Sequence, residues 1–158
     1  MRTISSHRPC IRVTALVVLL GPDRTQHAVA RLEPSRENPD GYHRLVGGGV
    51  EFGETSLGAV VREVREELGA MLIEPALLGV LENHFELDGD PGHEVVFVYS
   101  GRLDPPDTIP RQGGMFTDND QPMPVEWRPV NDAHERIPLY PNGIGALVAE
   151  AAASTQRN

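Results

Sequence analysis

The chain has 158 residues, a charged fraction of 23% and a formal net charge of −9. This length suits one domain with a real core, and the acidic balance argues against a partner such as long nucleic acid, whose phosphates usually select basic proteins. The single cysteine, Cys10, excludes an internal disulfide. Because no apolar run approaches the roughly 18 residues of a membrane span, we expect a cytoplasmic protein with no membrane partner.

The first part of the chain predicts strands separated by turns. Residues 1–9 are polar and predict a flexible tail, which leaves residues 10–158 as a single domain. Residues 11–20 are rich in Val, Leu and Ile without a helical period, which is typical of a buried strand. A Gly-Pro-Asp turn follows, and residues 28–32 can return as a second strand. Residues 33–41 then form a polar loop.

Three successive glycines, Gly47, Gly48 and Gly49, precede the clearest helix of the sequence. Such a run predicts a loop that a ligand can approach closely, because glycine has no side chain. Thr55 or Ser56 can cap the helix at its start, and Gly69 ends it. An apolar stripe at three- and four-residue spacing predicts the face that packs on the core. Its members are Leu57, Val60, Val61, Val64 and Leu68.

The second part of the chain predicts a hairpin, a long loop and a final helix. Strands are expected over residues 77–87 and 93–103, with a hairpin loop between them. Residues 104–123 contain four prolines and predict a loop, which at this length is more often functional or mobile than incidental. Residues 125–130 predict a strand with the only tryptophan, and residues 144–152 predict a C-terminal helix.

Glu63, Glu66 and Glu67 share one face of the central helix. Like charges three and four residues apart destabilise a helix by a few tenths of a kcal/mol per pair. A divalent cation such as magnesium would relieve this repulsion, because it prefers oxygen ligands. A solvated acidic face is the ordinary explanation of such a pattern. The glycines before the helix and Glu54 at its start favour a metal site here.

At this point the sequence resembles a known family. Residues 48–70 contain Gly48, then Glu54, then Arg62-Glu63-Val64-Arg65-Glu66-Glu67-Leu68-Gly69-Ala70 at the spacing of the Nudix signature. Every fixed residue of that signature is present, and Val64 and Ala70 stand at its two apolar positions. One departure is Val46, where the family often has proline before the paired glycines.

The resemblance implies a fold and a metal site. It implies an α/β fold, the Nudix-type α/β/α sandwich with a central mixed β-sheet. It also implies that Glu63, Glu66, Glu67 and the carbonyl of Gly47 hold magnesium (Mg²⁺), with manganese (Mn²⁺) as an alternative. Glu63 or Glu66 would act as the catalytic base towards water, and the resemblance leaves the choice between them open.

The remaining signature residues are expected to be structural, and a few later residues are candidates for the substrate or a further metal. An ion pair between Arg62 and Glu54 would tie the glycine segment to the helix. Gly48 and Gly69 would be needed for the conformation of the backbone. The candidates for contacts with substrate or an extra metal are His84, Glu94, Asp118 and Asp120. For each of them taken alone, an ordinary structural or solvent-exposed role is the simpler interpretation.

The resemblance therefore predicts an enzyme, a pyrophosphohydrolase that cuts the diphosphate bond of a nucleoside diphosphate linked to another moiety. The partner would be a small nucleotide-type substrate, and the family allows a homodimer. A non-catalytic nucleotide-binding or sensor module on the same fold is the alternative. Such modules usually lose a signature glutamate, and none is lost here. The secondary motifs of several substrate subgroups are absent, so the sequence leaves the substrate undefined.

Overall fold

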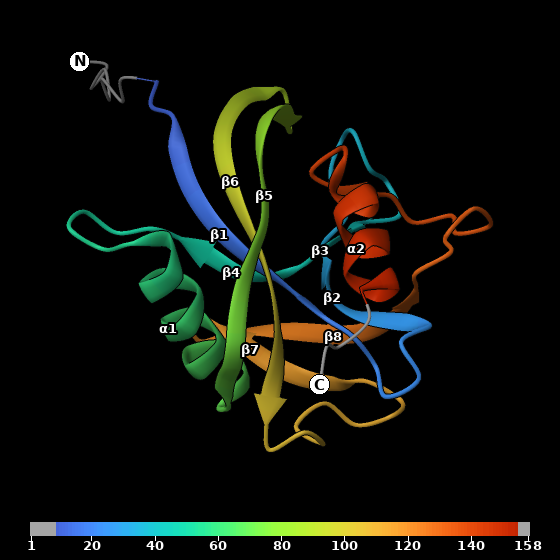
Figure 1. The fold of residues 1–158 in the computed structure, drawn as a ribbon. Helices are drawn as coiled ribbons and strands as arrows, with labels where there is room; N and C mark the ends of the chain where they lie inside the picture. Colours follow the sequence, from blue (N-terminus) through green and yellow to red (C-terminus); the bar gives the residue numbers. More distant parts are fainter. Residues whose placement is uncertain (1–8, 155–158) are drawn as a thin grey trace, which may run out of the picture.

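The computed structural model describes residues 9–154. The predicted tail, residues 1–9, lies outside the described residues except for Pro9. Within the described part the chain forms strands and two helices in an order that begins with four strands (Figure 1). The elements are β1 (Arg12–Leu19), β2 (Gln26–Leu32), β3 (Tyr42–Arg44), β4 (Val46–Gly49), α1 (Ser56–Leu68), β5 (Met71–Leu87), β6 (Asp90–Asp104), β7 (Gly114–Asp118), β8 (Gln121–Pro129), β9 (Leu139–Tyr140) and α2 (Ile144–Ala153).

A mixed β-sheet with the strand order β4-β1-β6-β5 lies between the two helices. Strand β1 pairs antiparallel with β4 and parallel with β6, and β6 pairs antiparallel with β5. Helix α1 packs near β4 and β1, whereas α2 packs near β5 and β9 (Figure 1). The predicted α/β class is therefore confirmed. A second sheet of order β7-β8-β2-β3-β9 adjoins the first.

Alternating side chains of β1 build two cores, one beneath each helix. Ala15, Val17 and Leu19 pack with the buried side of α1, while Leu16 and Val18 pack with the buried side of α2. All five side chains are buried. A strand that is covered on both faces has a continuous run of apolar residues. This explains why apolar and polar residues do not alternate along β1.

Helix α1 begins and ends where the sequence predicts. The Thr55 hydroxyl accepts a hydrogen bond from the Gly58 amide at 3.0 Å, and Gly69 ends the helix in the left-handed conformation with φ of 68°. Val60 and Val64 are fully buried as expected. The prediction was wrong for Leu57, which lies in the first turn of the helix and is 43% exposed.

The glycine run is a strand and not the predicted loop. Gly47, Gly48 and Gly49 pair with Leu16, Ala15 and Thr14 of β1. Glycine reads as a loop signal because it lacks a side chain, but here the lack of side chains permits close packing. A Cβ atom on Gly47 would lie 2.1 Å from the carbonyl oxygen of Ala15, and its φ of 144° disfavours other residues.

Two further segments differ from the prediction. The expected loop over residues 104–123 contains β7 and the beginning of β8, joined by a turn in which Asn119 and Asp120 have positive φ. Pro122 and Pro124 hid this hairpin in the sequence. They are tolerated because β8 pairs with β2 only from Val125 onward, so the prolines face β7 alone.

The long hairpin of β5 and β6 extends further than predicted at both ends. Strand β5 begins at Met71 because its ladder continues through two irregularities, the first between Ile73 and Ala76. Glu74, which has positive φ, and Pro75 lie at this bulge and hid the strand in the sequence. At the other end Asp88 and Gly89, both with positive φ, close the hairpin in a two-residue turn.

Buried polar groups lie between β2, β3 and β8. His27 is 1% exposed and Arg128 is 4% exposed, and among the described residues the Nδ1 atom of His27 has no hydrogen-bond partner. Burial lowers the pKa of His27 to about 4, and the nearby Arg128 charge acts in the same direction. His27 is therefore neutral in the folded protein at neutral pH.

This burial predicts an acid-sensitive stability. Unfolded His27 binds a proton below its ordinary pKa of 6.5, whereas folded His27 does so only near pH 4. The contribution of His27 is thus present above pH 6.5 and is lost as the pH falls towards 4, by up to about 3 kcal/mol. Urea unfolding should be measured at pH 7.5 and at pH 4.5. Between these pH values the free energy of unfolding should fall less for His27→Gln than for the unchanged chain. The exposed His134→Gln should behave like the unchanged chain, and equal pH dependence in all three would contradict this assignment.

Candidate active site

Helix α1 and strand β4 together bring the predicted metal ligands to one place. The helix carries Glu63, Glu66 and Glu67, and the amide of Gly47 in the glycine strand donates to Oε2 of Glu67 at 3.4 Å. Gly48 lies directly against Glu63, because a Cβ on this glycine would come within 2.6 Å of the Glu63 carboxyl group. The absence of side chains on β4 therefore makes the space that the carboxylates occupy.

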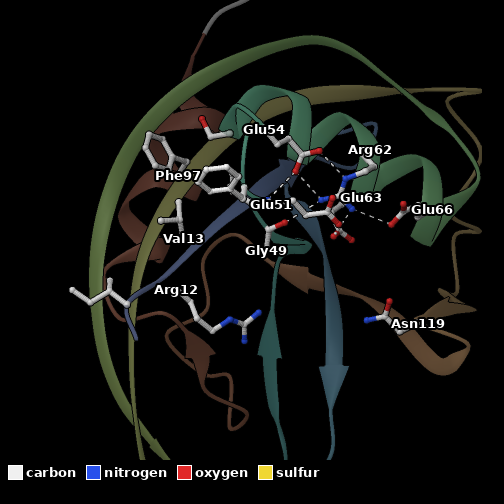
Figure 2. Close-up of a pocket in the computed structure, with 14 residues that line it drawn as sticks. Arg12, Val13, Gly49, Glu51, Glu54, Arg62, Glu63, Glu66, Phe97 and Asn119 are labelled. Atoms are coloured by element: carbon white, nitrogen blue, oxygen red, sulfur yellow. Dashed lines mark hydrogen bonds and ion pairs between the residues drawn. The ribbon is translucent and has the colours of Figure 1, made fainter. Parts of the chain in front are cut away.

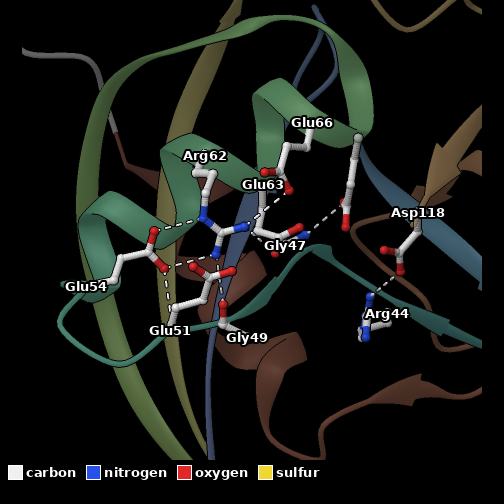
Figure 3. A network of polar contacts seen from close by, with 10 residues as sticks. Arg44, Gly47, Gly49, Glu51, Glu54, Arg62, Glu63, Glu66 and Asp118 are labelled. Carbon is white, nitrogen blue, oxygen red and sulfur yellow. Dashed lines mark hydrogen bonds and ion pairs between the residues drawn. The ribbon is translucent and has the colours of Figure 1, made fainter. Parts of the chain in front are cut away.

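Arg62 is the centre of the polar network around these acids (Figure 3). It donates two hydrogen bonds to Glu54, at 2.8 and 2.9 Å, and one to the carbonyl oxygen of Gly49 at 3.0 Å. The same guanidinium donates to Glu63 at 3.0 Å and to Glu66 at 3.1 Å. Its hydrogen bonds lower the pKa of Glu54 to about 2, so Glu54 stays ionised. Arg62 thus joins the end of β4 to two of the three helix acids.

Glu67 differs from the other two acids because it is buried. Its residue is 4% exposed, whereas the Glu66 side chain is 56% exposed. Within the described part of the chain, Oε1 of Glu67 has no hydrogen-bond partner. Burial raises the pKa of Glu67, and the negative charges of Glu63 and Asp118 act in the same direction, while Arg44 opposes them. A buried carboxylate oxygen without a partner is costly, which marks the position of Oε1 as one that a cation would stabilise.

The residues present fit a divalent cation. Glu67 supplies a free buried oxygen, Glu63 lies beside it, and both are hard oxygen donors of the kind that magnesium and manganese prefer. In the present side-chain arrangement, no three His, Cys, Asp or Glu residues among residues 9–154 already form a metal-binding group. The reason is visible in Figure 3, where Glu63 and Glu66 turn towards Arg62.

A cleft of about 970 Å³ opens at the acids (Figure 2). Glu63 and Glu66 lie on one side of it, and Arg12 and the apolar Val13 and Phe97 lie on the other. Asn119, from the turn between β7 and β8, also reaches this cleft. An acidic wall that faces a guanidinium can accommodate a metal-bound anion such as a diphosphate.

A second cavity of about 410 Å³ adjoins the cleft and shares Arg12 and Gly49 with it. Its wall contains Tyr42 and Tyr140, which pack edge to face with ring centres 5.6 Å apart, and the buried Asn83. Sequence reasoning missed Arg12, Arg44, Asn83 and Asn119 as site residues. No local motif marks them, since they come from four separate strands and turns.

The four candidates for substrate or extra metal contacts lie in different places. His84 and Glu94 line the second cavity, where the Thr14 hydroxyl donates to Glu94 at 3.5 Å. Asp118 lies 3.9 Å from Arg44 and acts on the charge of Glu67. Asp120 lies in the turn after β7, where it has positive φ, and it lines neither the cleft nor the second cavity.

Comparison with solved structures identifies similar folds. The chain is 21% identical to a MutT NUDIX hydrolase from Burkholderia pseudomallei, over 89% of this chain and 97% of that one, with a TM-score of 0.58. It is 20% identical to a mutator MutT protein from Bacillus halodurans, over 91% of this chain and 84% of that one, with a TM-score of 0.61. At these identities the likeness supports the fold.

Comparison of the sequence with family models gives the family. The curated proteins contain no match to the chain. The NUDIX domain model matches residues 11–147, which include both sheets, the signature helix and the cleft. The chain therefore belongs to the NUDIX domain family and is a Nudix hydrolase.

Proposed function

We propose that the chain hydrolyses the diphosphate bond of a nucleoside diphosphate linked to another moiety, with magnesium as the metal and manganese as an alternative. The observation that carries this proposal is the buried Glu67 carboxylate, whose Oε1 has no hydrogen-bond partner among the described residues and which lies beside Glu63 and the glycine strand. The diphosphate and the carboxylates of the site are both negatively charged, so hydrolysis here requires a cation between the diphosphate and the carboxylates.

The ligand set would be Glu63, Glu66, Glu67 and the carbonyl of Gly47. When bound, the metal supplies charge withdrawal from the diphosphate and lowers the pKa of a coordinated water. Glu63 or Glu66 would accept the proton of the attacking water. The side chain of Glu66 is 56% exposed and that of Glu63 is 13% exposed, so Glu66 is more accessible to water from the cleft.

The cavity next to the cleft suits the organic part of such a substrate. It holds about 410 Å³, and its wall has three aromatic side chains, Tyr42, Phe85 and Tyr140. It also includes Gly48, which lies against the Glu63 carboxyl group. Aromatic walls and a few polar groups are typical of sites for small organic ligands. The nucleoside would lie here, with the diphosphate at Arg12.

Arg12 provides a direct test of this placement, because it is the arginine common to both cavities. We expect Arg12→Ala to raise KM by about tenfold, with a smaller change in kcat, since it removes a charge that binds the phosphates in the ground state and the transition state alike. Steady-state kinetics measure both constants. The exposed Arg111→Ala, outside both cavities, is the control, and an unchanged KM for Arg12→Ala would contradict the placement.

The reaction is tested by phosphate release from a panel of nucleotides, with a coupling pyrophosphatase or phosphatase, in the presence and absence of magnesium. The panel contains canonical and oxidised nucleoside triphosphates, ADP-ribose, nucleotide sugars, diadenosine polyphosphates, NADH and coenzyme A. Magnesium-dependent release from one class would support the reaction and name the substrate. Tight binding of a nucleotide without turnover would favour the sensor alternative, although the retained glutamates argue against it.

Location and assembly stay predictions. Neither helix within residues 9–154 is long and apolar enough to cross a membrane. A cytoplasmic location, a single domain over residues 10–158 and a homodimer remain expectations from the sequence and the family.

A further inference from the structure

Two histidines face each other across the β5–β6 hairpin, outside the cluster of helix acids. His84 and His93 are directly paired residues of the antiparallel ladder. Their Nε2 atoms are 3.1 Å apart, and the ring centres are 4.1 Å apart at an angle of 61° between the planes. His84 is exposed and His93 is half-buried.

The separation of the two nitrogens matches that of two ligands of one metal ion. A zinc–imidazole bond is about 2.0–2.1 Å long, so two nitrogens at an angle of about 90–110° on the metal are about 2.9–3.3 Å apart. The observed 3.1 Å lies within this range. In the metal-free protein the same distance is explained by one imidazole donating to the other, and a metal ion would replace that shared proton.

Two carboxylates flank the histidine pair on the same face of the hairpin. Glu82, His84 and Glu86 are alternate residues of β5, and all three are exposed, whereas Asn83 between them is buried. Glu82 and Glu86 pair with Val95 and Pro91, which places both diagonally across from His93. Diagonal neighbours on a sheet are about 7–8 Å apart at Cα, within reach of long side chains. Among residues 9–154 no third ligand is already in place, so a rotated glutamate or water would complete the coordination.

We propose that His84 and His93 form a second metal site, selective for an imidazole-preferring divalent ion such as Zn²⁺, Ni²⁺ or Cu²⁺, with Glu82 or Glu86 as a further ligand. Its chemistry differs from that of the helix acids, because imidazole suits zinc, nickel and copper, whereas carboxylates suit magnesium. A metal here would tie β5 to β6 beside the second cavity, whose lining includes His84 and Glu86. This site does not depend on the proposed hydrolysis.

The test is a calorimetric titration of the full chain with Zn²⁺, in a buffer with excess Mg²⁺ that occupies the acidic site. One ion should bind per chain. His84→Gln and His93→Gln should each weaken that binding by about tenfold or more, because each removes one arm of a chelate. Glu82→Gln and Glu86→Gln together should weaken it less. The exposed His134→Gln is the matched control and should leave it unchanged.

Electron paramagnetic resonance of the chain with one equivalent of Cu²⁺ gives a readout that does not depend on affinity. Coupling to two imidazole nitrogens is expected, and a single nitrogen should remain in either histidine variant. Zinc binding of equal strength in the unchanged chain and both histidine variants would overturn the proposal. A copper spectrum without coupling to two nitrogens would also overturn it. Thermal unfolding of each variant without metal checks that the fold is retained.

Discussion

Glu67→Gln is expected to abolish most of the turnover and to leave the fold at least as stable as before. The substitution keeps the shape of the side chain and its contact with the Gly47 amide, but it removes the charge that would hold the metal. We expect kcat to fall by about a hundredfold or more. Stability without metal should stay equal or rise, because the unchanged Glu67 is a buried acid beside Glu63.

Thermal unfolding with and without magnesium separates the two effects. A ligand that binds only the folded protein raises its Tm, so magnesium should raise the Tm of the unchanged chain and have little effect on Glu67→Gln. The exposed Glu150→Gln on α2 is the matched control and should keep both activity and the magnesium effect. Near-normal activity in Glu67→Gln would contradict the proposal that the Glu67 carboxylate holds the metal.

Gly48→Ala is expected to reduce activity strongly while the protein still folds. The added methyl group would lie 2.6 Å from the Glu63 carboxyl group, so that side chain must move. Gly48 does not require a positive φ, and the backbone can therefore accept alanine. We expect kcat to fall by about tenfold to a hundredfold, because a displacement of about 1 Å in a catalytic group has effects of that size. The free energy of unfolding should change by about 1 kcal/mol or less.

The neighbouring Gly47→Ala provides the contrast, since its new methyl group meets backbone and not a side chain. At 2.1 Å from the Ala15 carbonyl oxygen, and with φ of 144°, it would force β4 away from β1. Destabilisation of about 3 kcal/mol or more is expected. Urea unfolding and kinetics on both variants decide the matter. If Gly48→Ala loses as much stability as Gly47→Ala, then Gly48 is needed for the pairing of β4 with β1 and not for the position of Glu63.

The helix and its acids could be predicted from the sequence because their signals are local. Thr55, the apolar spacing of Val60 and Val64, and Gly69 specify where α1 begins, which side it buries and where it ends. Capping and periodicity act within one or two turns, so a single segment contains all the information they need. The signature from Gly48 to Ala70 is recognisable for the same reason, because it lies within one short segment. The family resemblance rests on this signature, and the match to the NUDIX domain model agrees with it.

The glycine strand, β7 and the bulged start of β5 could not be predicted, because strand pairing depends on a partner far away in the chain. Gly48 belongs to a strand only because β1 lies beside it, and Pro122 is tolerated in β8 only because β2 does not pair with it there. Glycine and proline carry loop signals in isolation, and tertiary context overrides them.

The sequence alone determined that three carboxylates share one face of a helix. Their distances from β4 and from Arg62 depend on how the helix packs in the tertiary structure. The fold buries Glu67 and leaves Glu66 in the cleft, although they are adjacent in sequence and similar in chemistry. It also brings Arg12 and the His84–His93 pair into place from strands that no short motif connects. Side-chain environment depends on contacts between distant segments, and those contacts form only when the two sheets and two helices assemble.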